Sequence, residues 1–478
     1  MLGILLALFG MMGGPGDQGE LDTLPKNIAP DTTLSRTLQV NRILIIGNKI
    51  TRDRIILREL SLQAGDTINS KRLNTVLTRD KNKVYNLFLF NTVTVQALEL
   101  PDNRIDLLVE VEERWYIFPI PIFELSDRNF NEWWQNYGHD ITRVNYGIRL
   151  YRYNFRGRNE TLRLTAQFGF TRRFELSYRI PNLDRKQKNG MTFLFDYSEP
   201  KNAAYFTDDH KLVYLRLKKT VRTTLGAGVV YSYRKSFYET HSVAAEFRKS
   251  TIIDTIQYLN PNYYPAGKSE IKFGSITYSF SSDHRDVRQY PLKGYNFTAL
   301  VSKAGLGLGD DINQFEVNLT YSRYAALKNN FYLANFTSGY LSTPTSQPYV
   351  MYSALGYQRQ FIRGYEIYVI EGPKFFLNKT TLKKKIFSHT WRLEEMPLEQ
   401  FRHFPLTIYL KAYTDFGYVE NYPRYNEIKI NTALSDRLLA GAGFGIDIVS
   451  AYDSVFRLEY TFTREKTNGF FFHLKKEF

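Results

Sequence analysis

The feature that most constrains this chain is a series of short segments, from about residue 144 to 478, in which apolar and polar residues alternate. Clear examples are 162–168, 315–321 and 456–462. Alternation with a period of two is typical of β-strands, and segments of about nine to eleven residues match tilted strands that cross a bilayer. We count about sixteen such strands, with an uncertainty of about two, and predict a transmembrane antiparallel β-barrel. A soluble β-sandwich would show similar alternation.

The composition agrees with this prediction and excludes several classes of protein. Phe and Tyr each occur 35 times, as expected for strands and interfacial aromatic girdles. The mean hydropathy of −0.37 also fits barrel strands, in which apolar residues alternate with polar ones. The chain has no cysteine, which excludes disulfides, cysteine-ligated zinc, a thiol nucleophile and a lipid-anchored N-terminal cysteine.

The net charge of +15 on its own suggests an acidic partner such as nucleic acid. The basic residues are scattered through the alternating segments, however, at positions such as Arg163, Arg216 and Lys411, and they do not cluster on a helix. Scattered charge of this kind is typical of solvated or lumen-facing barrel positions. We therefore predict no nucleic-acid partner.

Residues 1–14 form an apolar run that ends in small residues. The run is too short for a membrane-spanning helix and predicts a secretory signal peptide, although the usual basic segment before it is missing. A membrane anchor or a disordered tail is the alternative. Residues 15–37 contain Pro15, Pro25 and Pro30 among few apolar residues, which predicts a flexible linker.

Residues 38–114 are predicted to form a small α/β domain with the order strand, helix, helix, strand, strand. The first strand stops at Gly47-Asn48, Thr51 is expected to cap the first helix, and Gly65-Asp66 breaks the chain before the second. With Arg58-Glu59-Leu60 and Phe90-Asn91-Thr92-Val93, this ordered set resembles a polypeptide-transport-associated (POTRA) domain.

Residues 115–143 are rich in aromatic residues and proline, including Pro119, Pro121, Trp133 and Trp134. Trp and Tyr favour the interface between membrane and water. We therefore predict a hinge between the small domain and the membrane surface.

A long loop within the strand series, from about residue 341 to 373, carries Phe361-Ile362-Arg363-Gly364-Tyr365. Loops of this length inside a compact domain are usually functional or disordered. Glycine permits a tight turn, and arginine offers a planar fork of donors to a carboxylate. We expect the loop to fold inward and to place its tip on the barrel wall.

The predicted partner of Arg363 is Asp415, because burying an unpaired arginine in a lumen is costly. Around Asp415, Leu410 and Ala412 share one strand phase, whereas Lys411 and Asp415 share the other. If the apolar phase faces lipid, Asp415 faces the lumen.

This arrangement resembles the barrel of the BamA superfamily (BamA/TamA-like) of outer-membrane assembly and secretion proteins. In that family an inward-folded loop ends in an Arg-Gly-aromatic tip, whose arginine pairs with an aspartate on an interior strand. The tip matches Ile362-Arg363-Gly364-Tyr365, and the strand matches Asp415-Phe416-Gly417. The resemblance implies that these two segments, which include Ile362, Arg363, Gly364, Tyr365, Asp415, Phe416 and Gly417, form the functional site.

Two further segments carry the resemblance. Asp283, Arg285, Pro291 and Gly294 lie in a segment similar to the family's turn before a barrel strand. The chain ends on an alternating strand that is similar to the C-terminal sorting signal of bacterial outer-membrane barrels and contains Phe470, Phe472, Leu474 and Phe478. One departure is that this chain has a single POTRA-like domain, where assembly members usually carry several.

The resemblance implies a bacterial outer-membrane barrel with its POTRA domain in the periplasm. Its partners would be unfolded outer-membrane or secreted protein clients, outer-membrane lipids and accessory assembly subunits, with no cofactor. Two roles stay open: assembly and insertion of barrel clients bound by the POTRA domain, and a two-partner-type protein secretion pore.

An enzyme inside a barrel is the third class of function. We expect no enzymatic activity, because the chain contains no Gly-x-Ser-x-Gly motif. The glycine-rich residues 441–445 lack the Lys-Ser/Thr of a phosphate-binding loop and are better explained as a strand. Asp283, His284 and Asp286 have no second histidine at ligand spacing, so no metal site is predicted.

Overall fold

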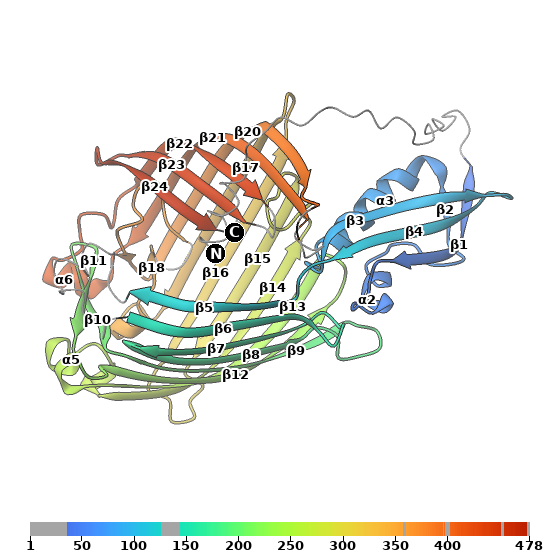
Figure 1. Ribbon diagram of the computed structural model, residues 1–478. Coiled ribbons are helices and arrows are strands. Elements are labelled where there is room, and N and C mark those ends of the chain that lie inside the picture. The colour runs from blue at the N-terminus through green and yellow to red at the C-terminus, as the bar shows by residue number, and fades with distance from the viewer. Residues whose placement is uncertain are drawn as a thin grey trace.

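The computed structural model describes residues 36–125, 144–356, 360–394, 396, 402–450 and 454–475. The predicted signal peptide, Trp133, Trp134 and Phe478 lie outside these ranges. Within them, no helix has the length and apolar character needed to cross a membrane. Figure 1 shows a small N-terminal α/β domain beside one end of a large curved sheet.

The small domain contains β1 (Thr37–Ile46), α2 (Asp53–Leu57), β2 (Thr67–Asn69), α3 (Ser70–Tyr85), β3 (Phe90–Leu100) and β4 (Arg104–Glu113). The strand order in its sheet is β2-β1-β4-β3, with β1 and β4 parallel. Helix α3 buries Leu73, Leu77 and Val84 against the sheet, at the spacing expected for one helix face. The Asn69 side chain caps this helix by accepting a hydrogen bond from the Lys71 backbone N–H.

Two local predictions in this domain differ from the structure. Thr51 does not cap α2, because its hydroxyl donates to Glu113 at 2.6 Å and the N-cap position is Arg52. Strand β2 was not predicted, because three residues are too few to show a period. Its pairing with β1, which joins Leu38 to Ile68, exists only through tertiary contact.

The large sheet has 16 strands in consecutive antiparallel order, which confirms the predicted fold class and number of strands. These strands are β5 (Ile117–Leu125), β6 (Val144–Phe155), β7 (Glu160–Gly169), β8 (Thr171–Ile180), β9 (Asn189–Pro200), β12 (Arg222–Arg234), β13 (Glu239–Ile252), β14 (Glu270–Asp283), β15 (Gly294–Ala304), β16 (Gln314–Ala326), β17 (Phe331–Thr343), β20 (Lys374–Arg392), β21 (His403–Glu420), β22 (Leu439–Ser450), β23 (Val455–Thr463) and β24 (Asn468–Lys475).

The first strand corrects the predicted boundary between hinge and barrel. Residues 117–125, expected to be part of a hinge, form β5 and pair with β6 from Ile117 to Leu125. Pro119 and Pro121 are two residues apart, so the positions of both missing N–H donors lie on the same side of the strand. Proline is tolerated there because β5 is an edge strand.

The two faces of the sheet differ as the alternation predicts. On β21, Leu410, Phe416 and Tyr418 are exposed on the outer face, whereas Lys411 and Asp415 are buried on the inner face. Outward apolar side chains with polar residues inside are the pattern of a membrane barrel. The 16-stranded sheet therefore surrounds a polar interior.

Additional short elements lie at the end of the sheet far from the small domain (Figure 1). We call this the cap end. It carries β10 (Asn202–Asp208), β11 (Lys211–Arg216), α5 (Asp254–Leu259), η2 (Pro265–Gly267) and α6 (Pro423–Ile428). Buried tyrosines make up much of the core of the cap, namely Tyr263, Tyr264, Tyr349, Tyr352, Tyr422 and Tyr425. The long loop between β17 and β20 contributes η3 (Tyr349–Met351), β18 (Ala354–Leu355) and β19 (Ile370–Glu371).

Candidate functional site

The tip of the loop between β17 and β20 lies buried inside the barrel. Ile362 is 1% exposed and packs in an apolar cluster with Leu355, Leu377 and Leu439. Tyr365 is also buried, and its hydroxyl donates to the Ala440 carbonyl and to Glu465. The loop therefore folds inward onto β21, β22 and β23.

Arg363 and Asp415 are in direct contact. The Arg363 backbone N–H donates to Asp415 Oδ2 at 3.0 Å, its Nε donates to the same oxygen at 2.8 Å, and its Nη2 donates to Oδ1. Asp415 is fully buried, so this bidentate pair lies in a site from which water is excluded. The guanidinium also stacks 3.8 Å above the centroid of the Tyr413 ring.

Glycines on the barrel wall make room for the tip. A Cβ atom added at Gly441 would lie 2.2 Å from the Arg363 carbonyl oxygen, and one at Gly417 would lie 2.4 Å from Ile362 Cδ1. Gly364 itself has φ +93°, which favours glycine, and an added Cβ there would lie 2.5 Å from Thr463 Cγ2. Glycine is therefore needed on the barrel wall, at Gly417 and Gly441, and on the loop tip, at Gly364.

Arg363 belongs to a larger chain of ion pairs that the sequence analysis did not assemble. Its Nη1 contacts Glu459 Oε1 at 3.5 Å, and Glu459 in turn accepts from Lys411 Nζ at 2.9 Å. Lys411 also pairs with Asp447, which accepts from Arg457 Nε at 3.1 Å. We call Asp415, Arg363, Glu459, Lys411, Asp447 and Arg457 the lumen charge chain.

A sequence signal for this chain of charges existed. Glu459 lies opposite the apolar phase of β23, as Asp415 and Lys411 do on β21. Phase places such residues in the interior, but only the register between strands decides which of them meet. In the structure, Lys411 lies opposite Gly445 on β22, and Gly445 lies opposite Glu459 on β23.

The predicted turn lies between β14 and β15, at the end near the small domain. Arg285 Nε and Nη2 donate to the two oxygens of Asp283, each at 2.8 Å. Gly294 has φ +99°, and a Cβ there would lie 2.1 Å from the His284 carbonyl oxygen. Pro291 is buried in the same turn. The four residues therefore shape the turn and do not contact the loop tip, although nearby Tyr290 donates to Asp447 at 2.9 Å.

The predicted C-terminal signal maps to β24. Phe470 and Phe472 are 85% and 60% exposed on the outer face, opposite Tyr460 and Leu458 of β23. Leu474 pairs with Phe456 through the backbone ladder. Phe416 is likewise exposed on the outer face of β21, so it flanks Asp415 in sequence without reaching the loop.

The ion pairs of the lumen charge chain hold the loop tip against the barrel wall. Among the residues that the structure describes, no group of His, Cys, Asp and Glu could hold a metal ion. The carboxylates of the lumen charge chain each have a cationic partner, which fits a role in positioning the loop.

Comparisons with known proteins agree with this fold. The description "Surface antigen variable number repeat" (POTRA) matches residues 38–114, and "Omp85 superfamily domain" matches residues 154–478. No curated protein sequence matches the chain.

Two solved structures are similar. The structure of BamA from Haemophilus ducreyi lacking POTRA domains 1–3 has a TM-score of 0.51 at 14% identity, over 91% of this chain and 83% of that one. CdiB from Escherichia coli has a TM-score of 0.54 at 10% identity, over 92% of this chain and 74% of that one. At these identities the likeness concerns the fold alone.

Proposed function

Because the chain belongs to the Omp85 superfamily, we propose that it is an outer-membrane assembly factor. In this proposal the POTRA domain lies in the periplasm and binds unfolded barrel clients, and the barrel aids their insertion into the membrane. No covalent bond is made or broken, so the protein needs no catalytic residue and no cofactor.

The observation that carries the proposal is that each terminal strand of the large sheet is paired on one side only in the described part of the chain. Among the described residues, β5 pairs only with β6 and β24 pairs only with β23 (Figure 1). An unpaired strand edge offers backbone donors and acceptors to another strand. A client strand could therefore add to either edge while its apolar side chains enter the lipid beside the outward-facing Phe123 and Phe470.

The POTRA domain offers a second edge. Strand β3 lies at the border of the four-stranded sheet and extends over 11 residues, whereas β2 at the opposite border has only three. An extended client is expected to add to β3, because main-chain hydrogen bonding accepts many different sequences.

The lumen favours insertion over secretion. The tip from Ile362 to Tyr365 is held inside by the lumen charge chain, so a secreted chain would first have to displace a buried ion pair. The insertion route along the strand edges leaves this contact intact.

A crosslinking experiment tests the role of the terminal edges. The chain has no native cysteine, so a single cysteine at Phe123→Cys or Phe472→Cys would report local contacts unambiguously. The matched control is Phe247→Cys, which is also exposed on the outer face but lies on β13, whose two edges are both paired. A cysteine-bearing barrel client is expected to crosslink at the terminal strands only, and equal crosslinking at all three sites would contradict the proposal.

Depletion of the protein distinguishes the two roles. A broad loss of barrel proteins from the outer membrane is expected for an assembly factor. Loss of one secreted partner from the medium, with other barrels intact, would instead identify a dedicated secretion pore.

A further inference from the structure

The POTRA domain is docked against the end of the barrel through polar contacts. Glu59 is 2% exposed and accepts a bidentate pair from Arg234 at the end of β12, with Nη2–Oε2 at 2.7 Å. The Arg288 backbone N–H donates to Asn86 Oδ1 at 3.1 Å. The docked arrangement brings α2 and α3 against the turns that join the barrel strands.

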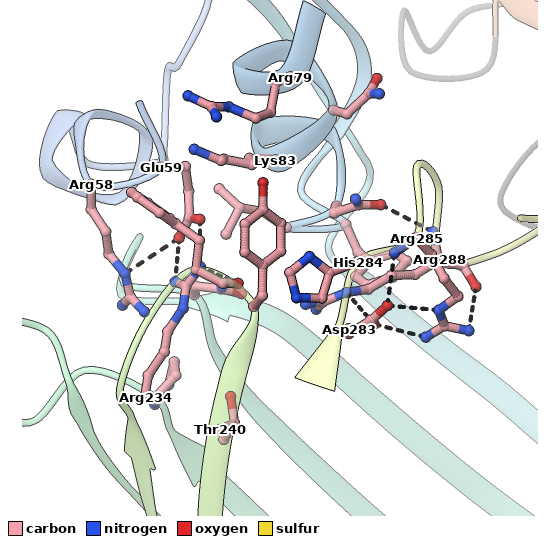
Figure 2. Close-up of a pocket in the computed structure, with 18 of the residues that line it drawn as sticks. Arg58, Glu59, Arg79, Lys83, Arg234, Thr240, Asp283, His284, Arg285 and Arg288 are labelled. Atoms are coloured by element: carbon pink, nitrogen blue, oxygen red, sulfur yellow. Dashed lines mark hydrogen bonds and ion pairs between the residues drawn. The ribbon is translucent and has the colours of Figure 1, made fainter. Parts of the chain in front are cut away.

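A cavity of about 710 Å³ lies between the two parts. On the POTRA side it is lined by α2 and α3, and Figure 2 shows Arg79 and Lys83 extending from α3. On the barrel side it is lined by the ends of β8 and β12 and by the turn from Asp283 to Arg288. We call it the junction cavity. Ser232 and Arg234 of its lining belong to the inward phase of β12, since Tyr231 and Tyr233 are exposed outside.

The lining is strongly cationic. Eight lysines and arginines face three carboxylates, which gives a net charge of +5. Each of two carboxylates, the buried Glu59 and the partly buried Asp283, is shared between two guanidinium groups. Glu59 contacts Arg58 and Arg234, and Asp283 contacts Arg285 and Arg288. Burial and repulsion by the nearby Arg234 lower the pKa of Arg58 to about 10. Arg58 therefore stays charged at neutral pH and contributes to the positive charge of the cavity.

Some polar side chains of the cavity have no partner in the part of the chain that the structure describes. Among the described residues, Arg179 of β8 makes no hydrogen bond or ion pair, and it lies close enough to Arg288 and Arg234 to be repelled by both. The side chains of Asn74 and Asn82 on α3 likewise make no hydrogen bond in the described part of the chain. A guanidinium without a counter-charge among the described residues, in a cavity that is also lined by two amides, is a site for an anionic ligand with additional polar groups.

The chemistry of the lining favours a peptide over a compact anion. Guanidinium forks bind carboxylates in a bidentate manner, and free amide side chains can pair with a peptide backbone. Leu87, Phe88 and Phe237 add apolar surface for aliphatic or aromatic side chains. The volume lies in the range of about 300–1,000 Å³ typical of sites for molecules much larger than phosphate.

We propose that the junction cavity binds an acidic segment of a client polypeptide, with Arg179 as a principal contact to a carboxylate. This inference rests on the proposed function and deepens it, since it names the chemistry by which the docked POTRA domain and barrel recognise a client before its strands pair. A client held here lies between helices α2 and α3 of the POTRA domain and the ends of the barrel strands.

The test uses the full chain in detergent and a fluorescein-labelled ten-residue peptide with three glutamates and one phenylalanine. The matched probe has glutamine in place of each glutamate. The glutamate peptide is expected to bind at least about tenfold more tightly, and Arg179→Gln is expected to weaken it about tenfold, as for loss of one charge-assisted hydrogen bond. The control is Arg149→Gln on β6, an inward-facing arginine outside the cavity lining.

Several outcomes would overturn the inference. These are equal binding of the two peptides, equal effects of the Arg179 and Arg149 substitutions, or displacement by inorganic phosphate at a concentration no higher than that of the peptide. Heat-modifiable migration on a gel verifies that each variant keeps its barrel. Because no folding client is present, a negative result leaves the assembly role standing, and a negative depletion result leaves peptide binding standing.

Discussion

The contact between Arg363 and Asp415 predicts a large local effect of Asp415→Ala. The substitution leaves the Arg363 guanidinium, which is 4% exposed, with Glu459 at 3.5 Å as its one charged partner among the described residues. Removing one partner of a buried ion pair typically costs about 3–5 kcal/mol, and we expect the lower end because Glu459 remains. The barrel itself should persist, since the strand ladder of β21 does not depend on this side chain.

Hydrogen–deuterium exchange measures this loss in the loop itself. A cost of about 3 kcal/mol raises the population of the open loop by about two orders of magnitude, so amides in residues 360–371 should exchange about 100-fold faster. Arg363→Ala should have a similar effect, because it leaves the fully buried Asp415 without its main partner. The double variant should cost little more than either single one, since the pair is lost only once.

Two results with these three variants would contradict a role of the ion pair in holding the tip. Unchanged exchange in the loop of both single variants would show that the pair does not hold the tip. Additive effects in the double variant would show that each residue stabilises the loop through separate contacts. A client-assembly assay on the same variants then tells whether loop seating matters for function, for which we expect a partial loss.

Three further predictions concern other contacts. Gly441→Ala should unseat the loop tip and increase exchange in residues 360–371, whereas Gly339→Ala, whose Cβ meets nothing within 4 Å, should not. Glu59→Gln should weaken docking of the POTRA domain and broaden spin-label distances to the barrel, whereas Glu110→Gln on β4, exposed in the POTRA sheet, should leave them unchanged. Burial lowers the pKa of His210 in the cap to about 4 from 6.5, so the unfolded cap binds a proton that the folded one excludes. Cap stability should therefore fall as pH drops from 6.5 toward 4, by up to about 3 kcal/mol, and proteolysis of the hairpin of β10 and β11 should increase at pH 4.5 relative to pH 7.

The alternation of residues was sufficient to predict which side chains face inward, because a strand has only two faces. Asp415 and Lys411 were placed in the inward phase from spacing alone, and both are buried. The partner of Arg363 followed from the cost of burying a lone guanidinium together with the family resemblance. The alternation does not, however, show at which level along the barrel axis an inward-facing side chain lies.

The features that the sequence does not predict depend on the register between neighbouring strands or on contacts between the two domains. Lys411 meets Asp447 and Glu459 only because the ladders of β21, β22 and β23 align them. Strand β5 lies in the segment predicted as a hinge from its prolines and interfacial aromatic residues, and its position at the edge becomes visible only in the assembled sheet. The junction cavity joins α3 to strand ends about 100 to 200 residues further along the chain, which no local pattern reveals.

The course of the lumen charge chain links the loop to the barrel edge. It runs from Asp415 on β21 through Arg363 on the loop to Glu459 and Arg457 on β23, the strand that pairs with β24. The seated tip therefore adds side-chain contacts between strands near the terminal strand β24. In the described part of the sheet, β24 has backbone hydrogen bonds to a neighbouring strand on one side only. Because buried ion pairs are costly to separate, a seated tip should stiffen this edge, and release of the tip should loosen it. In an assembly factor, the seated loop would then keep the terminal strand in an ordered form to which a client can add, which is the reason for the partial loss of assembly expected when the tip is released.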